Sequence, residues 1–376
     1  MIIEQARWTP GQGWSPKPGR QPDADLVLLF SDRVALENER LAREVRGLYP
    51  RAAVLGCSTA GEILGAEARD GGAALTAVRF SSSRAAGAQT EIAQADDSYA
   101  AGQRLARALE KKELRHVLVL ADAPPRVNGS ELVRGLASAL PPGTTITGGM
   151  AGDGMRFSRT RLAWDGAVCG GAAAVGLYGP KLAIACGSRG GWDTFGPERM
   201  ITRSRGNVLY ELDGKSALEL YKLYLGDHAR ELPGAAVHYP LALRGQPGCE
   251  GIVRSVLAVD EADQSMTFAG DVPQGAYARM MKANFDRLID GAAGAAEACR
   301  KARGGPSPLA LMISCAGRKM VLGQRVEEEL EAARDVLGPA ALCGFYSYGE
   351  IAPFEGGTRC ELHNETMTIT TLAEEP

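Results

Sequence analysis

The sequence predicts an α/β protein with mixed sheets, on three observations. Continuous apolar runs, which indicate buried strands, alternate with segments that have one apolar helical face. This strand–helix–strand order occurs three times, and each copy ends in a glycine beside an acid, at Gly61-Glu62, Gly152-Asp153 and Gly349-Glu350. The segments after the second copy follow an antiparallel meander pattern. We therefore expect two domains with three pseudo-repeated βαβ-plus-strand units and antiparallel meander additions.

Composition limits the classes of function. A length of 376 residues favours about two domains, and 45% hydrophobic residues can build a sizeable core. A net charge of −3 gives no electrostatic case for binding nucleic acid or a membrane surface. No apolar run approaches the ~20 residues that span a bilayer, and no secretory signal is seen. The eight scattered cysteines indicate reduced thiols, so we expect a cytoplasmic protein.

The N-terminal segment and the domain limits come from local composition. Residues 1–24 contain four prolines among few apolar runs, which predicts an irregular arm. Trp8 and Trp14 would attach this arm to the surface. We expect a first domain over 25–213 and a second over 214–376, with the boundary at Asp213-Gly214.

The first two copies follow one order. Residues 25–30 and 116–121 are strands, each followed by a helix and a return strand. Asn128, three residues before Glu131, is a capping-box-like helix start. Phe30 to Gly61 and Ala121 to Gly152 are both 31 positions apart, which indicates an internal duplication.

The remaining segments complete the prediction. Asp165-Gly166 is a strong hairpin signal and opens the meander. A helix after residue 214, antiparallel strands up to residue 268 and a helix over 283–303 lead to the third copy. That copy begins with a strand at 309–314 and ends with a strand at 366–372.

Five motifs resemble those of FIST proteins, and they occur in the family's order. They are Gly-Cys-Ser-Thr-Ala-Gly-Glu-Ile at 56–63, Gly-Gly-Met-Ala-Gly-Asp at 148–153, Ser-Cys-Ala-Gly-Arg at 314–318, Gly-Phe-Tyr-Ser-Tyr-Gly-Glu-Ile-Ala-Pro at 344–353 and Leu-His-Asn at 362–364. The resemblance implies tandem N-terminal and C-terminal FIST domains, which are regarded as sensory modules that bind small molecules such as amino acids. In bacterial signalling such domains occur alone or fused to output domains. No residues remain here for an output domain, so a separate signalling protein is the expected partner.

Two acids are the main candidate ligand groups. Glu62 and Glu350 could hold an amine or accept hydrogen bonds from a polar ligand in a cleft at the domain junction. Hydroxyl donors lie beside them in the same motifs: Ser58, Thr59, Tyr346 and Tyr348. The alternative for both acids is that each carboxylate caps backbone N–H groups at its own turn. For Asp153 this capping role is the favoured interpretation.

Cysteine chemistry is a competing hypothesis. Cys57 and Cys315 each end a predicted strand, where a nucleophile would need a base and an orienting group. The chain has four histidines, and Ser-Cys-Ala-Gly-Arg differs from known cysteine-hydrolase signatures. A structural or ligand-lining thiol is therefore favoured, and no catalytic residue is assigned. Arg318 could bind a carboxylate or phosphate bidentately, or lie on the surface.

Haem is the third hypothesis, because some FIST members resemble haem-binding sensors that respond to nitric oxide. A haem needs an axial ligand such as histidine, cysteine, methionine or tyrosine. His363, beside Asn364, is the one histidine in a family-like motif, although a hydrogen-bonded polar role is favoured for it. Cys360 and His363 have the spacing of half a metal site, but two unrelated residues are the favoured interpretation, and no metal site is predicted. Phosphate-loop, zinc-protease and serine-hydrolase motifs are absent.

Overall fold

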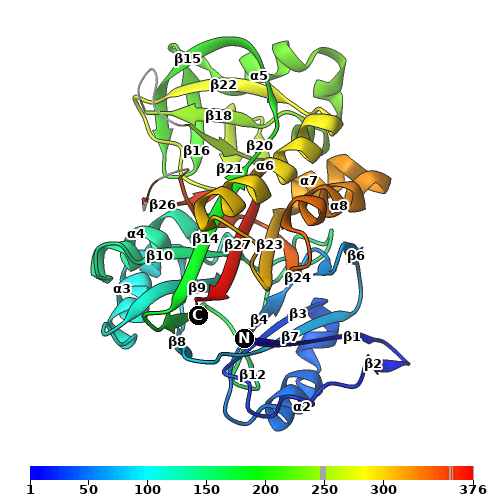
Figure 1. Ribbon diagram of the computed structural model, residues 1–376. Helices are drawn as coiled ribbons and strands as arrows, with labels where there is room; N and C mark the ends of the chain where they lie inside the picture. The colour runs from blue at the N-terminus through cyan, green and yellow to red at the C-terminus, as the bar shows by residue number, and fades with distance from the viewer. Residues whose placement is uncertain (246–250, 355–356, 358, 376) are drawn as a thin grey trace.

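The computed structural model describes residues 1–245, 251–354, 357 and 359–375. In these residues the chain forms three sheets around a common interior and a fourth sheet in an upper lobe (Figure 1). The predicted α/β class with mixed sheets is confirmed. Among the helices of this described part, none is long and apolar enough to cross a membrane.

The first sheet has the strand order β12-β11-β4-β3-β7-β1-β2. Its strands are β1 (Ile2–Thr9), β2 (Gly13–Ser15), β3 (Leu26–Ser31), β4 (Ala53–Ser58), β7 (Ala73–Arg79), β11 (Leu162–Trp164) and β12 (Ala167–Cys169). Its helices are α1 (Arg33–Glu37) and α2 (Arg40–Leu48).

The second sheet has the order β26-β25-β10-β9-β13-β8. Its strands are β8 (Arg84–Thr90), β9 (Leu114–Ala121), β10 (Thr145–Met150), β13 (Ala172–Tyr178), β25 (Glu350–Pro353) and β26 (Cys360–His363). The helices on it are η1 (Ala95–Asp97), α3 (Ser98–Ala108) and α4 (Gly129–Ala139). The Asn128 side chain accepts a hydrogen bond from the Glu131 N–H, which confirms the predicted start of α4.

The third sheet has the order β14-β27-β23-β24-β5-β6. Its strands are β5 (Glu62–Leu64), β6 (Glu67–Arg69), β14 (Leu182–Arg189), β23 (Leu309–Cys315), β24 (Ala341–Ser347) and β27 (Met367–Glu374). Its helices are α6 (Phe285–Arg303), α7 (Ala316–Leu322), η4 (Gly323–Arg325) and α8 (Val326–Leu337).

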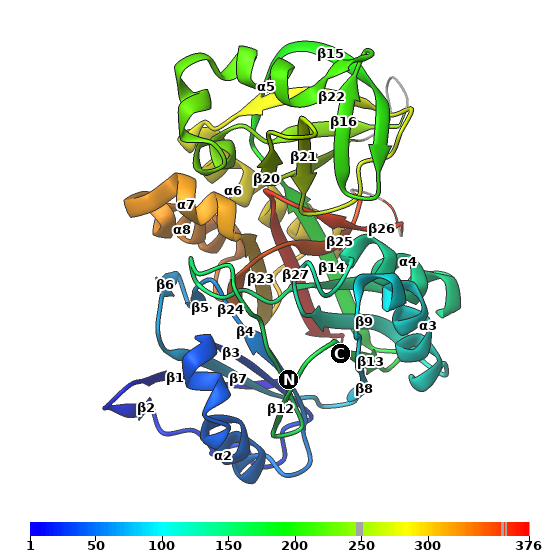
Figure 2. The same cartoon turned by 180° about the vertical axis from the view of Figure 1, so that it is seen from behind.

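The upper lobe is inserted between β14 and α6, and its sheet has the order β19-β18-β22-β15-β16-β21-β20 with β17 beside β16. Its strands are β15 (Asp193–Arg205), β16 (Val208–Leu212), β17 (Lys215–Ser216), β18 (Leu241–Arg244), β19 (Ile252–Arg254), β20 (Val256–Asp260), β21 (Ser265–Phe268) and β22 (Tyr277–Lys282). Its helices are α5 (Ala217–Leu225), η2 (Gly226–Glu231) and η3 (Gly234–His238). Figure 2 shows this lobe from behind, above the three-sheet body.

The three lower sheets exchange hairpins in a closed cycle. The β5–β6 hairpin leaves the first unit and pairs with β24 of the third. The β25–β26 hairpin leaves the third unit and pairs with β10 of the second. The β11–β12 hairpin leaves the second unit and pairs with β4 of the first. Apart from β2 at the edge of the first sheet, all three sheets therefore have the same strand order, which supports the predicted threefold repetition.

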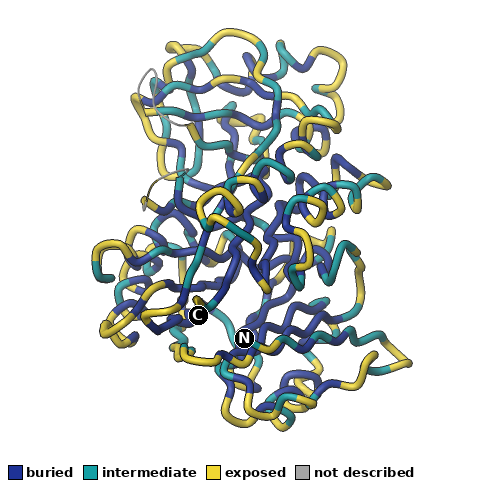
Figure 3. The backbone as a smooth tube through the Cα atoms, in the orientation of Figure 1, coloured by how far each residue is buried: buried dark blue, intermediate teal, exposed yellow. Residues whose placement is uncertain are grey.

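The main core lies where one face of each lower sheet meets the other two. Leu28, Leu118 and Leu311 come from β3, β9 and β23, and all three are buried in one cluster. Phe30 and Phe345 stack within it with their ring centroids 4.7 Å apart. The opposite faces of the sheets pack against helices in separate clusters. Figure 3 shows the buried residues concentrated in this body.

A glycine in each return strand permits close contact with the neighbouring strand. Gly56, Gly148 and Gly344 hold equivalent places in the register with β3, β9 and β23. A Cβ on Gly344 would lie 1.7 Å from the Met312 carbonyl oxygen, and one on Gly148 would lie 1.7 Å from that of Val119. Only glycine fits at these two positions.

This register corrects the sequence alignment of the second copy. When the return strands are aligned on these glycines, Gly61 and Gly349 correspond to Asp153, one position after Gly152. The equal spacing of 31 positions from Phe30 to Gly61 and from Ala121 to Gly152 therefore ends at residues that are not equivalent in the structure. Glu62 and Glu350 pair with Phe345 and Gly149 across the sheets. Cys57 holds the place of Phe345 and Gly149 in the first sheet, and it pairs with Leu162 of the second unit. The second unit therefore has a leucine where the other two units have a glutamate.

The expectation of an irregular arm at residues 1–24 is wrong. β1 pairs with β7 over seven registered residue pairs, and β2 pairs with β1, so this segment forms one edge of the first sheet. Trp8 and Trp14 pack against the cluster beneath the first sheet. Three of the four prolines lie after β2 and Pro10 lies in the turn before it, while β1 carries the ordinary alternation of a half-buried edge strand.

We expect Gly344→Ala to destabilise the fold by about 3 kcal/mol or more, since the added methyl group must displace the Met312 carbonyl in the core. The matched control is Gly47→Ala in α2, where a Cβ meets nothing within 4 Å. That change should raise stability by a few tenths to ~1 kcal/mol through helix propensity. Denaturant unfolding of both variants measures the difference, and equal stability would contradict the close-packing argument.

Candidate functional site

A cleft of about 550 Å³ lies between the three-sheet body and the upper lobe. Its floor includes residues directly after β9, β23 and β24, and strand ends of this kind are where α/β sheets present ligand-binding groups. Its other walls come from the 157–161 segment and from the lobe. The lining residues used below are Asp122, Arg126, Phe157, Arg159, Arg161, Gly234, Ser255, Cys315, Gly317, Tyr348 and Glu365.

Glu365 is the buried acid of this cleft. Its side chain is 1% exposed, and Ser255 Oγ of the lobe donates a hydrogen bond to Oε1 at 2.6 Å. Oε2 has no hydrogen-bond partner among the described residues. Burial raises the pKa of Glu365 to about 7, against the opposing effects of the Ser255 hydrogen bond and the Arg318 charge. The neutral form of Glu365 is thus favoured by burial, and one of its oxygens is buried without a hydrogen-bond partner among the described residues.

The backbone around Glu365 is built to hold its carboxylate. A Cβ on Gly317, in the first turn of α7, would lie 2.4 Å from Glu365 Oε1. Trp192 Nε1 donates a 2.8 Å hydrogen bond to the Glu365 carbonyl oxygen. The absence of a side chain at Gly317 thus leaves space for the Glu365 carboxylate, and the hydrogen bond from Trp192 holds the backbone of Glu365 in place.

An aromatic pair forms another part of the wall. Phe157 and Tyr348 stack with ring centroids 4.7 Å apart and an interplanar angle of 14°. Tyr348 Oη donates to the Gly154 carbonyl oxygen at 3.0 Å, and burial raises the pKa of Tyr348 to about 12. Tyr348 is therefore a neutral donor held in place, whereas Phe157 is 52% exposed.

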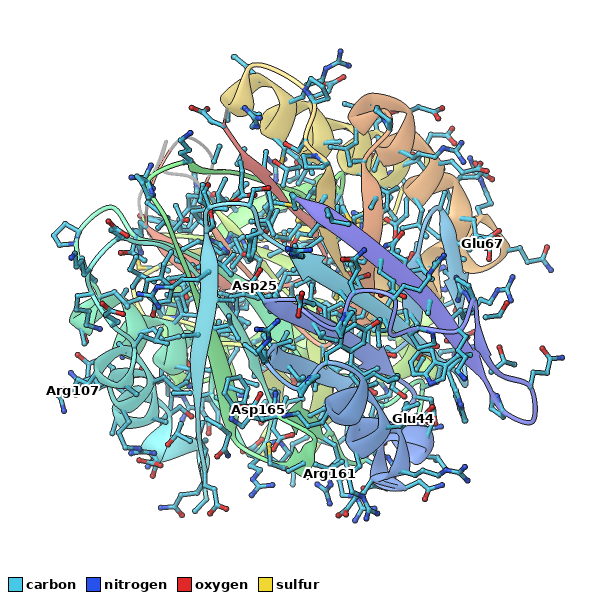
Figure 4. The ribbon with its side chains drawn as sticks, turned by 60° about the horizontal axis from the view of Figure 1, so that its bottom comes forward. Asp25, Glu44, Glu67, Arg107, Arg161 and Asp165 are labelled. Atoms are coloured by element: carbon cyan, nitrogen blue, oxygen red, sulfur yellow. The ribbon has the colours of Figure 1, made fainter. Side chains whose placement is uncertain are left out.

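Three arginines give the cleft a cationic side. Arg126 forms an ion pair with Asp122 at 3.4 Å, and Arg159 and Arg161 pair with Glu37 of α1 at 2.9 and 3.2 Å. Figure 4 labels Arg161, which lies beside the helices of the first sheet. The Arg126 and Arg159 side chains are 43% and 53% exposed, so both can reorient toward an anionic ligand group.

Asp122 is the buried carboxylate that pairs with Arg126. Its Oδ2 accepts from the Gly171 N–H at 2.8 Å, and its Oδ1 accepts from Thr160 Oγ1 at 2.9 Å. Burial raises the pKa of Asp122, and these hydrogen bonds oppose that effect. The carboxylate thus organises the loop that presents Arg126.

Of the sequence-predicted site residues, the cleft brings together Cys315 and Tyr348. Cys315 is 4% exposed, and burial is the largest of the causes that raise the pKa of its thiol well above the usual range. Among the described lining residues none is histidine. The base that a cysteine nucleophile needs is thus not supplied by that lining.

Glu62 and Glu350 are not part of this lining and do not form the expected shared cleft. Thr59 Oγ1 and the Gly72 N–H donate to Glu62, while Ser347 Oγ and the Thr366 N–H donate to Glu350. Each carboxyl therefore ties the start of an exchanged hairpin to its end. Burial raises the pKa of both Glu62 and Glu350 to about 8, against these hydrogen bonds.

The other residues of the first motif are also internal. Cys57 lies in the central core, where burial raises the pKa of its thiol. Ser58 Oγ accepts from the Arg161 N–H at 2.9 Å, so it fixes the segment that carries Arg161. Thr59 serves Glu62, as described above.

Asp153 and Arg318 form ion pairs within the protein. Asp153 accepts hydrogen bonds from the Arg33 and Arg156 side chains at 2.8 and 2.7 Å. Burial alone would raise the pKa of Asp153, but these hydrogen bonds outweigh it and lower the pKa. Arg318 is fully buried, and its Nε and Nη2 lie 3.0 and 2.7 Å from Glu329 Oε2. Neither residue presents a free charge to the cleft.

Tyr346, His363 and Asn364 also lie outside the cleft lining. Tyr346 Oη donates to Glu329 Oε1 at 2.8 Å. His363 Nε2 lies 3.1 Å from the Ala352 carbonyl oxygen, and burial lowers the pKa of His363 to about 4. The Asn364 side chain is fully buried, and neither its nitrogen nor its oxygen has a hydrogen-bond partner in the described part of the chain.

These positions do not fit a haem. The nitrogen of His363 that would bind iron is engaged with a carbonyl oxygen, and the ring packs edge-on against Phe354. Tyr348 in the cleft is engaged through its hydroxyl, and the Cys315 thiol is buried in its neutral form. No described group of three or more His, Cys, Asp or Glu residues has a metal-binding arrangement.

Sequence reasoning missed the main groups of the cleft. Glu365 directly follows the Leu-His-Asn motif, and an acid at the entrance to a strand was the one signal that could have found it. Phe157, Arg159 and Arg161 lie in the segment between β10 and β11, which has no periodic pattern. Arg126 follows a strand end but belongs to none of the motifs.

Comparison with known proteins gives two family matches that adjoin. The model of the FIST N domain matches residues 25–215, and that of the FIST C domain matches residues 217–353. An uncharacterized protein of Mycobacterium tuberculosis is 27% identical over 246 residues. Another from Mycobacterium bovis is 26% identical over 255 residues, and one from Methanocaldococcus jannaschii is 25% identical over 198 residues.

These relatives are matched over part of their length. The match spans 62% of this chain and 62% of each of the two mycobacterial proteins. For the M. jannaschii protein it spans 49% of this chain and 37% of the relative. The names of these relatives assign no activity.

We expect stability to fall as pH rises from about 5 to 9. The pKa of Glu350 is raised from 4.5 to about 8, so the folded state holds this proton more tightly than the unfolded state. The associated stability is fully present below pH 4.5 and is lost as pH rises through 8. A difference of one between the folded and unfolded pKa values corresponds to about 1.4 kcal/mol of stability. Glu350→Gln, which cannot ionise, should flatten the melting-temperature profile, and parallel profiles would exclude a buried neutral Glu350.

We also expect slow alkylation of Cys315. Its buried, neutral thiol should react with iodoacetamide at pH 7 more slowly than a free cysteine, because the thiolate is the reacting species. Peptide mass spectrometry of native protein measures the rate, and the unfolded protein is the control. Labelling of native Cys315 faster than in the unfolded chain would revive the hypothesis of an activated nucleophile.

Proposed function

Because this chain belongs to the FIST family, we propose that it is a sensory module that binds a small polar molecule in the cleft between the three-sheet body and the upper lobe. FIST domains are generally sensory, ligand-binding domains of signal transduction. A separate signalling protein would receive the signal.

The lining of the cleft is the observation that carries this proposal. A volume of about 550 Å³ is in the range of small-molecule sites, which combine apolar walls with a few placed polar groups. Here Phe157 supplies an apolar surface, Glu365 a buried acceptor, and Arg126 and Arg159 positive charge. Acid and base on one cleft suit a molecule with both charges, and an amino acid is the simplest of that class.

The position of the cleft favours a sensory output. Its walls come from the body and from the inserted lobe, and Ser255 of the lobe donates to Glu365 of the body. A ligand between them would favour the arrangement of lobe and body that it contacts best. A partner that binds both parts could then distinguish the liganded protein from the free one.

A thermal-shift screen of amino acids and related metabolites tests the proposal. A ligand at one hundred times its Kd stabilises the fold by about 2.7 kcal/mol, and each kcal/mol moves the melting temperature by about 2–4 °C. Gly234 lines the cleft, and a Cβ there meets nothing within 4 Å. We expect Gly234→Trp to fold and to abolish the shift by filling the cleft.

Gly47→Trp is the matched control for that variant, since Gly47 is exposed in α2 and its Cβ position is equally open. It should keep the full shift. A ligand that shifts Gly234→Trp as strongly as the unaltered protein binds elsewhere and contradicts the cleft assignment. Consumption of the ligand with the appearance of product would contradict a purely sensory role.

A further inference from the structure

Two residues of the cleft hold strained backbone conformations. Among the described residues, seven other than glycine have positive φ, and two of these, Phe157 at 48° and Glu365 at 62°, line the cleft. This region is unfavourable for residues with a Cβ, and such strain concentrates at ligand-binding sites. Bulky Phe157 is an outlier in this region, since asparagine and aspartate are the residues that tolerate it best.

Comparison of the pseudo-repeated units shows that Glu365 departs from its counterpart. The first unit carries Gly71 at the equivalent place. Ala73 pairs with Ser31 at the end of β3, and Met367 pairs with Ser314 near the end of β23, so Gly71 and Glu365 each lie two positions before the paired residue. Gly71 has φ 80° and Glu365 has φ 62°, so the backbone adopts the left-handed conformation at this place in both units. Glycine adopts that conformation without strain. The third unit instead keeps a glutamate, at a cost in both backbone strain and burial of a carboxyl.

The hydrogen bonds of Glu365 satisfy one of its two oxygens. Oε1 accepts from Ser255 Oγ, and Oε2 is buried in the cleft wall with no partner among the described residues. A buried acceptor without a partner is unfavourable in the free protein. A ligand that donates a hydrogen bond to Oε2 would remove that cost, most strongly if the donor is a cation.

Phe157 provides the other contact. One face of its ring stacks on Tyr348, and the side chain remains 52% exposed. An exposed aromatic ring on the wall of a cleft can stack with a flat ring or lie beside a cation. The geometry therefore offers a planar apolar contact and a buried acidic acceptor in the same cavity.

We propose that Glu365 and Phe157 are the specificity-determining pair of the cleft, and that they select a small molecule that has both a protonated alkyl amine and a flat ring. This inference rests on the proposed ligand-binding function and narrows it. The chemistry is shared by arylalkyl amines and aromatic amino acids. Arg126 and Arg159 would add a contact for the carboxylate of the amino acids, and the amines lack that group.

Titration calorimetry with four probes tests the chemistry. 2-Phenylethylamine has both ring and charge, 2-phenylethanol lacks the charge, n-butylamine lacks the ring, and phenylalanine adds a carboxylate. We expect binding of 2-phenylethylamine or phenylalanine at least roughly tenfold tighter than that of the alcohol or the alkylamine. Tighter phenylalanine binding assigns the amino-acid source, and tighter amine binding assigns the amine source. Equal affinity for all four probes would overturn the inference.

Variants at Glu365 separate recognition from structural support. Glu365→Gln keeps the shape and removes the charge, and Glu365→Gly adopts the residue of the first unit. Both should weaken binding of the preferred probe by about tenfold or more. The melting temperature of Glu365→Gly should be equal to or above that of the unaltered protein, because strain is relieved. A purely structural Glu365 would instead show reduced stability with unchanged affinity for the folded protein, which would overturn the inference.

A variant at Phe157 tests the ring contact separately. Phe157→Leu retains apolar character and removes the aromatic face, so affinity for 2-phenylethylamine should fall while affinity for n-butylamine stays the same. An equal loss for both probes would contradict a ring-specific contact. If another class of small molecule binds and Gly234→Trp abolishes its binding while all four probes fail, the proposed function stands and this inference is wrong.

Discussion

The structure depends on one constraint, the cyclic exchange of hairpins among three similar units. Each return strand carries a glycine at the contact with the unit's first strand, and each pairs on its other side with a hairpin from another unit. None of the three lower sheets is therefore complete without a neighbour. The shared core follows from the same arrangement, because the exchanged strands bring one apolar face of every sheet to a common centre.

This constraint also places the cleft. The exchange fixes β9, β23 and β24 relative to one another, so the residues after these strands form one floor. Glu62 and Glu350 hold the ends of exchanged hairpins, which explains why acids of the most recognisable motifs are internal to the fold. The upper lobe, inserted between β14 and α6, covers that floor. In the proposed function, the strand ends would contact a ligand and the upper lobe would enclose it.

The sequence predicts the individual helices and strands of this protein better than it predicts which strands pair with one another. The strand at 309–314 and the cap at Asn128 follow from periodicity and side-chain hydrogen bonding, and both are confirmed. Alternating apolar residues do not specify which sheet edge a hairpin will join, so the exchange was not predicted. The motif predicts Glu62 as a ligand group in a cleft, whereas the structure buries it against Thr59 and Gly72, which are brought beside it by the hairpin. Glu365 gave no periodic signal, because its importance lies in a backbone angle and an unpaired oxygen.

The exchange has a consequence for how the chain is made. β5 and β6 are synthesised early, but their partner β24 emerges from the ribosome roughly 280 residues later. At common rates of synthesis this interval is roughly 15–55 s. Throughout that time the hairpin has an open edge that can pair with other nascent chains. The first unit can therefore complete its pairing only once β24 is available, and the edge of the hairpin stays open until then.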